Sequence, residues 1–113
     1  LIVTERKKGG ESINAQTLVR LVNKADAVVV DLRDKKEFSA GHIASAVNLP
    51  YASFANRTGE LNQYKERPIV LVCKMGQHSS AIGGKLITEG FSDVKRLSGG
   101  MTEWVGSNLP VVK

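Results

Sequence analysis

The chain has 113 residues, a length that fits one domain with one hydrophobic core. Hydrophobic residues make up 42% of it and charged residues 24%, an ordinary balance for a globular protein. The net charge is +5, but the basic residues are scattered and only 5% of residues are aromatic, so we do not expect binding to nucleic acid. A single cysteine excludes an intrachain disulfide, and one cysteine with two histidines is too few for the usual four-ligand structural zinc site.

The N-terminal part of the chain predicts an arm followed by a helix. Residues 1–11 are expected to form a flexible basic arm, and residues 12–113 to form the folded domain. Apolar residues at helical spacing predict a helix over about 15–23, with Ser12 or Asn14 as its cap.

Apolar runs and helix signals then alternate. The run over 27–32 is apolar on both faces, as in a strand buried within a parallel sheet. Asp34 is placed to cap a short helix that ends near Gly41. Residues 46–49 predict a short strand, which Pro50 stops.

The second half of the chain continues this alternation. Residues 51–67 are polar and less regular, with a short helix predicted to be capped by Thr58. The remaining predicted elements are a strand over 69–72, a helix capped by Ser79 or Ser80 that runs to about Glu89, a strand over 93–97 and a short helix over 101–105. Short strands that alternate with helices predict an α/β fold with a largely parallel sheet.

The single cysteine, Cys73, directly follows the strand predicted over 69–72. In parallel α/β sheets, ligand sites form beyond the carboxyl ends of the strands. A helix begins a few residues later, and the free N–H groups at a helix N-terminus stabilise a thiolate. Gly76 permits a backbone that aims successive N–H groups inward, and Lys74 and His78 add positive charge. The loop therefore predicts a reactive thiol in a cradle built mainly from backbone.

Two alternatives to a sulfur-carrying thiol remain at this point. A free cysteine is often a buried packing residue, although the polar residues that follow Cys73 fit that interpretation poorly. A small cysteine phosphatase or arsenate reductase would need an arginine six positions after the cysteine to bind phosphate bidentately, and that position is Ser79. A persulfide, formed when Cys73 takes a sulfur atom from an anionic donor, suits the smaller cradle better.

Three motifs in order resemble the single-domain rhodaneses, a family of sulfurtransferases. They are VVVDLRDKKEFSAGHIASAVNLP at 28–50, the apolar strand that leads into Cys73 with Gly76 after it, and LSGGMTEW at 97–104. The resemblance extends from about residue 12 to residue 110. It implies an α/β fold with a central, mostly parallel five-stranded sheet flanked by helices on both faces.

The resemblance also implies a reaction. Cys73 would accept sulfane sulfur from thiosulfate or a related small anionic donor and pass it to cyanide or another thiophilic acceptor, a small molecule or a protein thiol. No metal or organic cofactor is implied. The substrate-binding loop that wraps the persulfide would consist of Lys74, Met75, Gly76, Gln77 and His78. The family commonly has an arginine where this chain has His78, which leaves the preferred donor open.

Other polar residues of the motifs are interpreted as structural. We expect Asp31 and Arg33 to form a supporting ion pair, with Glu37 as a further partner and Arg33 close to the site. His42 is interpreted as a hydrogen-bonded structural histidine, and Trp104 as a core residue beneath the loop.

The alternative function is a non-catalytic rhodanese-like module that binds a protein partner. The run LVNKADAVVVDLR also resembles membrane-anchored bacterial members of the family, and the chain begins at Leu1 without a methionine. Two locations are therefore expected: the cytoplasm, or the cytoplasmic face of the inner membrane if an N-terminal anchor has been removed from this chain.

Overall fold

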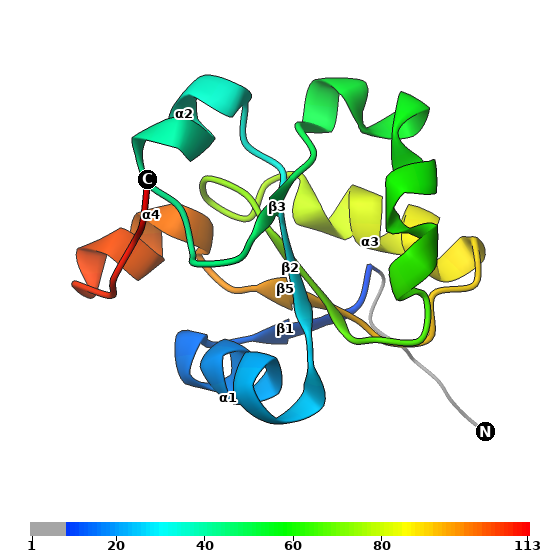
Figure 1. Ribbon diagram of the computed structural model, residues 1–113, viewed down its shortest axis with the longest axis horizontal. Helices are drawn as coiled ribbons and strands as arrows, with labels where there is room; N and C mark the ends of the chain where they lie inside the picture. Colours follow the sequence, from blue (N-terminus) through cyan, green and yellow to red (C-terminus); the bar gives the residue numbers. More distant parts are fainter. Residues whose placement is uncertain (1–8) are drawn as a thin grey trace.

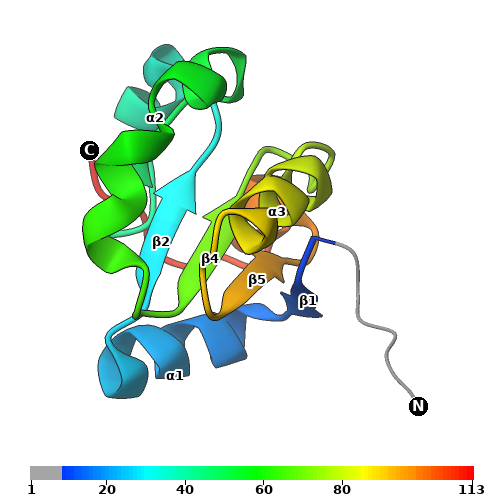
Figure 2. The same ribbon diagram turned by 90° about the vertical axis from the view of Figure 1, so that its right-hand side faces the viewer.

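All five strands of the sheet run parallel in the computed structural model, which describes residues 9–113 (Figure 1). In spatial order the strands are β1 (Glu11–Ile13), β5 (Val94–Leu97), β4 (Ile69–Val72), β2 (Val28–Asp31) and β3 (Val47–Asn48). The predicted five-stranded α/β sheet is confirmed. β4 lies at its centre, so the residue that follows β4 emerges in the middle of the sheet's carboxyl edge (Figure 2).

Helices cover both faces of the sheet (Figure 1). In chain order they are α1 (Ala15–Ala25), α2 (Lys35–Ala40), the 3-10 helices η1 (Tyr51–Asn56) and η2 (Thr58–Tyr64), α3 (Ser79–Thr88) and α4 (Gly100–Gly106). In β4, Ile69 and Leu71 pack into the apolar layer that includes side chains of η1, η2 and α3. Val70 and Val72 pack on the other face with side chains of α1 and α4. Burial on both faces explains why this strand is apolar at every position.

Two of the predicted helix caps are in place. The side chain of Asn14 accepts a hydrogen bond from the N–H of Thr17 at 2.9 Å and caps α1. Asp34 caps α2 by accepting from the N–H of Glu37 at 2.8 Å. Ser12, the other candidate cap for α1, lies in β1 instead.

The predicted cap at Thr58 is wrong. Thr58 is the first residue of η2, and the residue at the cap position, Arg57, makes no side-chain capping hydrogen bond. The buried side chains Phe54 and Leu61 hold η1 and η2 against the sheet, so packing rather than capping fixes these two short helices.

The folded part begins earlier than predicted. Glu11, which the sequence placed in the flexible arm, begins β1 and lies opposite Lys95 of β5. Gly9 and Gly10 are buried, the first against α3 and the second against the start of β5. The rest of the predicted arm, residues 1–8, lies outside the described residues.

Lys95 ties the edge strand β1 to its neighbour. Its Nζ lies 3.0 Å from the carboxylate of Asp93 and 3.4 Å from that of Glu11. Burial lowers the pKa of Lys95, but the hydrogen bonds and charges of Asp93 and Glu11 outweigh burial and raise the pKa above its usual value of 10.5. A lysine whose pKa is raised on folding stabilises the folded state at pH values below its pKa in the unfolded chain. This contribution is lost as the pH rises through its pKa in the folded protein. The tie is therefore intact throughout the neutral range.

Substitution of the adjacent glycines Gly83 and Gly84 in α3 tests whether Gly9 packs against this helix. A Cβ at Gly83 would collide with the backbone carbonyl of Gly9, whereas a Cβ at Gly84 would meet nothing within 4 Å. We expect Gly84→Ala to stabilise the protein by up to about 1 kcal/mol, because alanine is the better helix former. Gly83→Ala should instead destabilise it relative to Gly84→Ala, as measured by urea unfolding. Equal midpoints for the two variants would contradict the packing of Gly9 on α3.

Candidate active site

Cys73 lies immediately after β4, at the edge of the sheet where the parallel strands end. Its side chain is 1% exposed and belongs to the apolar layer on the α3 face. Its Sγ accepts a hydrogen bond from the N–H of His78 at 3.4 Å, and His78 is the N-cap residue of α3. The thiol therefore faces the N-terminus of a helix, as predicted. This arrangement stabilises negative charge on the sulfur.

The loop over residues 74–78 turns back over the sulfur. Gly76 has φ +86°, in the left-handed region that favours glycine. A Cβ at Gly76 would have ordinary room, so the site requires the backbone conformation there and not the missing side chain. The hydroxyl of Ser79 donates to the carbonyl of Gly76 at 3.2 Å and is buried. The predicted capping role of Ser79 is therefore wrong: His78 is the N-cap residue of α3, and the Ser79 hydroxyl braces the loop through the carbonyl of Gly76.

The first turn of α4 holds the start of the loop from the other side. The N–H groups of Met101 and Thr102 donate to the carbonyls of Cys73 and Lys74, both at 2.8 Å. Gly100 has φ +58°, and a Cβ there would collide with the carbonyl oxygen of Cys73. The glycine pair in LSGGMTEW thus permits a close approach of two backbones.

The cationic side chains near the sulfur are paired with carboxylates. Lys74 is 59% exposed and its Nζ lies 3.8 Å from the carboxylate of Glu37. Arg33 binds Asp31 at 2.8 Å in the predicted ion pair, and both of these side chains are largely buried. The expectation that Glu37 joins the Asp31–Arg33 pair is wrong, since α2 turns Glu37 toward Lys74.

His78 lines the opening over the sulfur, and Met75 of the same loop is exposed to solvent. A cavity of about 250 Å³ opens over Cys73, and Tyr51 and His78 form part of its wall. The rings of Tyr51 and His78 stack with centroids 3.8 Å apart and 9° between their planes. Met75 is 61% exposed and Tyr51 is 42% exposed. The sequence did not single out Tyr51, because the segment that carries it has no regular pattern.

The side chain of Gln77 enters the loop, which the sequence did not predict. Its Oε1 accepts the N–H of Met75 at 2.8 Å and lies 3.5 Å from the Sγ of Cys73. From the sequence, Gln77 was expected only as one residue of the loop that wraps the persulfide. A long amide side chain just after a left-handed glycine was the available signal, since such a turn lets the side chain reach back over the loop.

The Asp31–Arg33 pair links three segments beside the site. Asp31 also accepts the backbone N–H of Arg33 at 3.0 Å, and Arg33 Nη2 donates to the carbonyl of Gly41 at 2.8 Å. The side-chain amide of Asn48 donates to the carbonyls of Asp31 and Arg33 at 3.0 and 2.9 Å. These contacts fix the ends of β2 and β3 and the C-terminus of α2 around the cavity.

Two other residues of the motifs have structural contacts. The Nδ1 of His42 lies 2.7 Å from the carbonyl of Phe38, and the two rings stack with centroids 3.7 Å apart. Trp104 is 4% exposed, and its Nε1 donates to the carbonyl of Pro110 at 2.9 Å. The structural interpretation of His42 and the core placement of Trp104 are confirmed.

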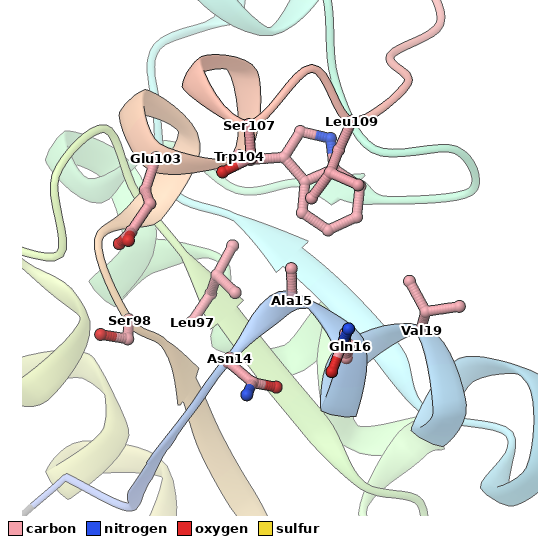
Figure 3. Close-up of a pocket in the computed structure, with 10 residues that line it drawn as sticks. All are labelled: Asn14, Ala15, Gln16, Val19, Leu97, Ser98, Glu103, Trp104, Ser107 and Leu109. Atoms are coloured by element: carbon pink, nitrogen blue, oxygen red, sulfur yellow. The ribbon is translucent and has the colours of Figure 1, made fainter.

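A larger cavity, of about 570 Å³, lies between the start of α1 and α4 (Figure 3). Its walls include apolar side chains of Val19, Leu97 and Trp104, and Glu103 is the single charged residue among its described lining residues. Size alone favours this cavity, but Cys73 and the N–H groups around it lie at the smaller one. We therefore assign the candidate active site to the cavity over Cys73.

Comparison with known proteins agrees with the geometry of this site. The model of the rhodanese-like domain matches residues 14–107. The chain belongs to the rhodanese-like domain family. It is 43% identical over 95 residues to the uncharacterized protein YibN of Escherichia coli K12, a match that covers 83% of this chain and 66% of that protein. The chain thus spans slightly less than two thirds of that relative's length.

Other relatives carry functional names or have solved structures. The chain is 38% identical over 90 residues to the thiosulfate sulfurtransferase GlpE of Pseudoalteromonas translucida, covering 80% of this chain and 83% of that protein. A crystal structure of a rhodanese-related protein from Thermoplasma volcanium superposes with a TM-score of 0.75 and 26% identity, covering 90% of this chain and 97% of that one. The polysulfide-sulfur transferase of Wolinella succinogenes has the same fold, with a TM-score of 0.78 at 21% identity, over 94% of this chain and 80% of that one.

The predicted similarity to membrane-anchored members stays a prediction. Among residues 9–113, no helix of this rhodanese-like domain is long and apolar enough to cross a membrane.

The buried ion pair beside the site yields a test of its structural role. In Arg33→Met, the carboxylate of Asp31, 1% exposed, would lose its charged partner and keep only the backbone N–H of residue 33. Breaking a buried pair in this way costs about 3–5 kcal/mol, so we expect a loss of stability of that size in urea unfolding. The matched control is Arg57→Met, because Arg57 forms an exposed pair with Glu60 at 2.8 Å.

In the control pair, the hydrogen bond between the two groups raises the pKa of Arg57 and lowers the pKa of Glu60. Solvent screens such exposed pairs, so Arg57→Met should leave the unfolding midpoint unchanged. A small and equal effect of both substitutions would show that the Asp31–Arg33 pair does not support the fold.

Proposed function

We propose that this rhodanese-like protein is a sulfurtransferase in which Cys73 is the nucleophile and carries the transferred sulfur as a persulfide. The observation that carries the proposal is the position of Cys73 at the end of the central strand, with the N–H of the α3 N-cap residue 3.4 Å from its sulfur. The names of relatives at 33–38% identity, which are thiosulfate sulfurtransferases, support the same reaction class.

The proposed reaction has two displacement steps. In the first, the Cys73 thiolate attacks the outer sulfur of the donor. With thiosulfate, the new S–S bond forms as the bond between the two thiosulfate sulfurs breaks, and sulfite leaves with the electron pair. In the second, an acceptor such as cyanide or a thiolate attacks the outer sulfur of the persulfide. The Cys73 thiolate leaves and is ready for another cycle.

The loop backbone would stabilise the thiolate and the persulfide. The N–H of His78 reaches Sγ directly, and the N–H groups of Gly76 and Gln77 have no hydrogen-bond acceptor among the described residues. N–H groups that converge in a left-handed turn form a nest for anions. We propose that residues 74–78 bind the donor through these groups and that His78 contacts it at the mouth.

The charge around the cavity bears on the choice of donor. Lys74 and Arg33 are each paired with a carboxylate, and Asp34 and Glu37 also line the cavity. Because few unpaired cations remain, this cavity should attract a dianion such as thiosulfate less strongly than a cavity with an arginine in place of His78. We therefore propose small sulfane-sulfur donors in general, with thiosulfate as one of them. The acceptor is proposed to be cyanide or another thiophile, including a protein thiol.

A non-catalytic module that binds a protein partner is the second candidate function. The low exposure of Cys73, at 1%, favours it, because an inert packing cysteine is buried in this way. The two candidates differ in one property. In a pure binding module the thiol resists alkylation in the native state, whereas the proposed nucleophile reacts.

We also propose a cell compartment for this domain. A reactive thiol without a disulfide partner suits the reducing cytoplasm, where we place this domain.

Intact-mass measurement tests the sulfurtransferase directly. We expect wild-type protein incubated with thiosulfate to gain the mass of one sulfur atom, and cyanide to remove it as thiocyanate. Cys73→Ser should gain nothing, because the side chain that forms the S–S bond is absent. If thiosulfate gives no gain, glutathione persulfide serves as a second donor of lower charge density. Failure with both donors would overturn the proposal and leave the binding module as the preferred function.

A further inference from the structure

The side chain of Gln77 reaches back into the loop beside the sulfur of Cys73. Its Oε1 accepts the N–H of Met75 at 2.8 Å. Because Met75 N–H is a donor, the oxygen and not the amide nitrogen of Gln77 must face it. The same oxygen lies 3.5 Å from the Sγ of Cys73. The amide orientation is therefore fixed, with its electron-rich end toward the sulfur.

The contact with Gln77 suits a thiol and not a thiolate, and it opposes the N–H of His78, which favours negative charge on the same sulfur. A thiol S–H donates to the amide oxygen, as the contact between Sγ and Oε1 indicates. A thiolate has no proton to share with that oxygen, so two groups of negative partial charge would face each other at 3.5 Å. The N–H of Met75, which would otherwise help to bind an anion, is also occupied.

We propose that Gln77 is a positioning residue that keeps the resting loop closed: its amide oxygen takes the place of an anionic group of the sulfur donor, and it must leave before Cys73 reacts. When the side chain leaves, the thiol proton passes to a base in solvent and the electron pair stays on sulfur. The N–H of Met75 then becomes free to bind the donor. This inference rests on the proposed sulfurtransferase function.

The surroundings of Gln77 allow this movement. The residue is exposed, so its side chain moves into water without losing packing in the core. It lines the cavity over Cys73 together with His78 and Lys74, so the departure of the amide enlarges the space next to the sulfur. The main loss is one neutral hydrogen bond, a contribution that corresponds to about three- to tenfold in an equilibrium.

The amide of Gln77 and the donor would compete for the N–H of Met75, and this competition affects donor binding. A donor must displace the amide oxygen of Gln77 from the N–H of Met75. The apparent affinity for any donor is therefore reduced in proportion to the fraction of molecules in which the amide occupies this N–H. Removal of the amide should therefore lower KM, while the rate of the sulfur-transfer step depends mainly on Cys73 itself.

Three substitutions at Gln77 separate the effect of the amide oxygen from the effect of side-chain size. Gln77→Ala removes the side chain, Gln77→Met keeps its length without the acceptor, and Gln77→Glu keeps its length with a charged acceptor. Gln63→Ala is the matched control, because Gln63 is an exposed glutamine on η2 whose amide contacts only the carbonyl of Glu60 among the described residues. Far-ultraviolet circular dichroism checks that each variant is folded.

Alkylation of Cys73 by iodoacetamide, a neutral reagent, is the first measurement and needs no sulfur donor. At pH 7 we expect Gln77→Ala and Gln77→Met to react about three- to tenfold faster than wild type, with the midpoint of the pH–rate profile moved to lower pH. Gln77→Glu should react more slowly than wild type, with the midpoint moved to higher pH, because its charge repels the thiolate. Gln63→Ala should match wild type.

The second measurement is the KM for thiosulfate, or for glutathione persulfide if that is the working donor. Gln77→Ala and Gln77→Met should lower KM by a similar factor with a smaller change in kcat. Unchanged or slower alkylation in both variants, with an unmoved pH profile, overturns the role of Gln77. If the alkylation results are as expected but no variant and no donor gives a persulfide, the sulfurtransferase proposal fails and the control of the thiol by Gln77 stands.

Discussion

The geometry of the site depends on two backbone hydrogen bonds, from Met101 and Thr102 to the carbonyls of Cys73 and Lys74. In a trans peptide the C=O and N–H groups point in opposite directions. Since both carbonyls point toward α4, the N–H groups of the following residues point away from it, and the N–H of Met75 indeed reaches into the loop. The contact requires Gly100, where a side chain would collide with the Cys73 carbonyl. A glycine far along the chain thus sets the direction of the loop's donors.

The parallel sheet supplies the other half of this arrangement. Asp31 is the register partner of Val72, and the N–H of Leu32 donates to the carbonyl of Val72 at 2.7 Å, one residue before Cys73. The Asp31–Arg33 pair therefore acts on the site through the backbone of β2, although neither side chain touches the sulfur among the described contacts. Asp31 and Arg33 therefore have a structural role, although they belong to a motif that borders the site. The ends of β2 and β4 position one another.

The sequence predicted those parts of the molecule that local patterns determine. The apolar run over 69–72, the caps Asn14 and Asp34 and the left-handed position at Gly76 each follow from a few adjacent residues. β1 was missed because it has three residues and a single buried side chain, which is too short for a strand pattern. In the loop, the backbone was predictable but the side chains were not. The contacts of Glu37 with Lys74 and of Tyr51 with His78 join segments that only the fold brings together.

In the proposed sulfurtransferase, recognition of an anionic donor would have a long-range and a short-range part. The net charge of +5 attracts anions toward the molecule as a whole. At the mouth, however, Lys74 and Arg33 are already paired, so little unbalanced positive side-chain charge remains to hold a donor. Under this proposal, selection of the donor would fall to backbone N–H groups, whose hydrogen bonds depend steeply on distance and direction. The amide oxygen of Gln77 satisfies one of these donors in the resting loop. The proposed site would therefore discriminate between donors by how well the bound atom fits the loop, and much less by the total charge of the donor.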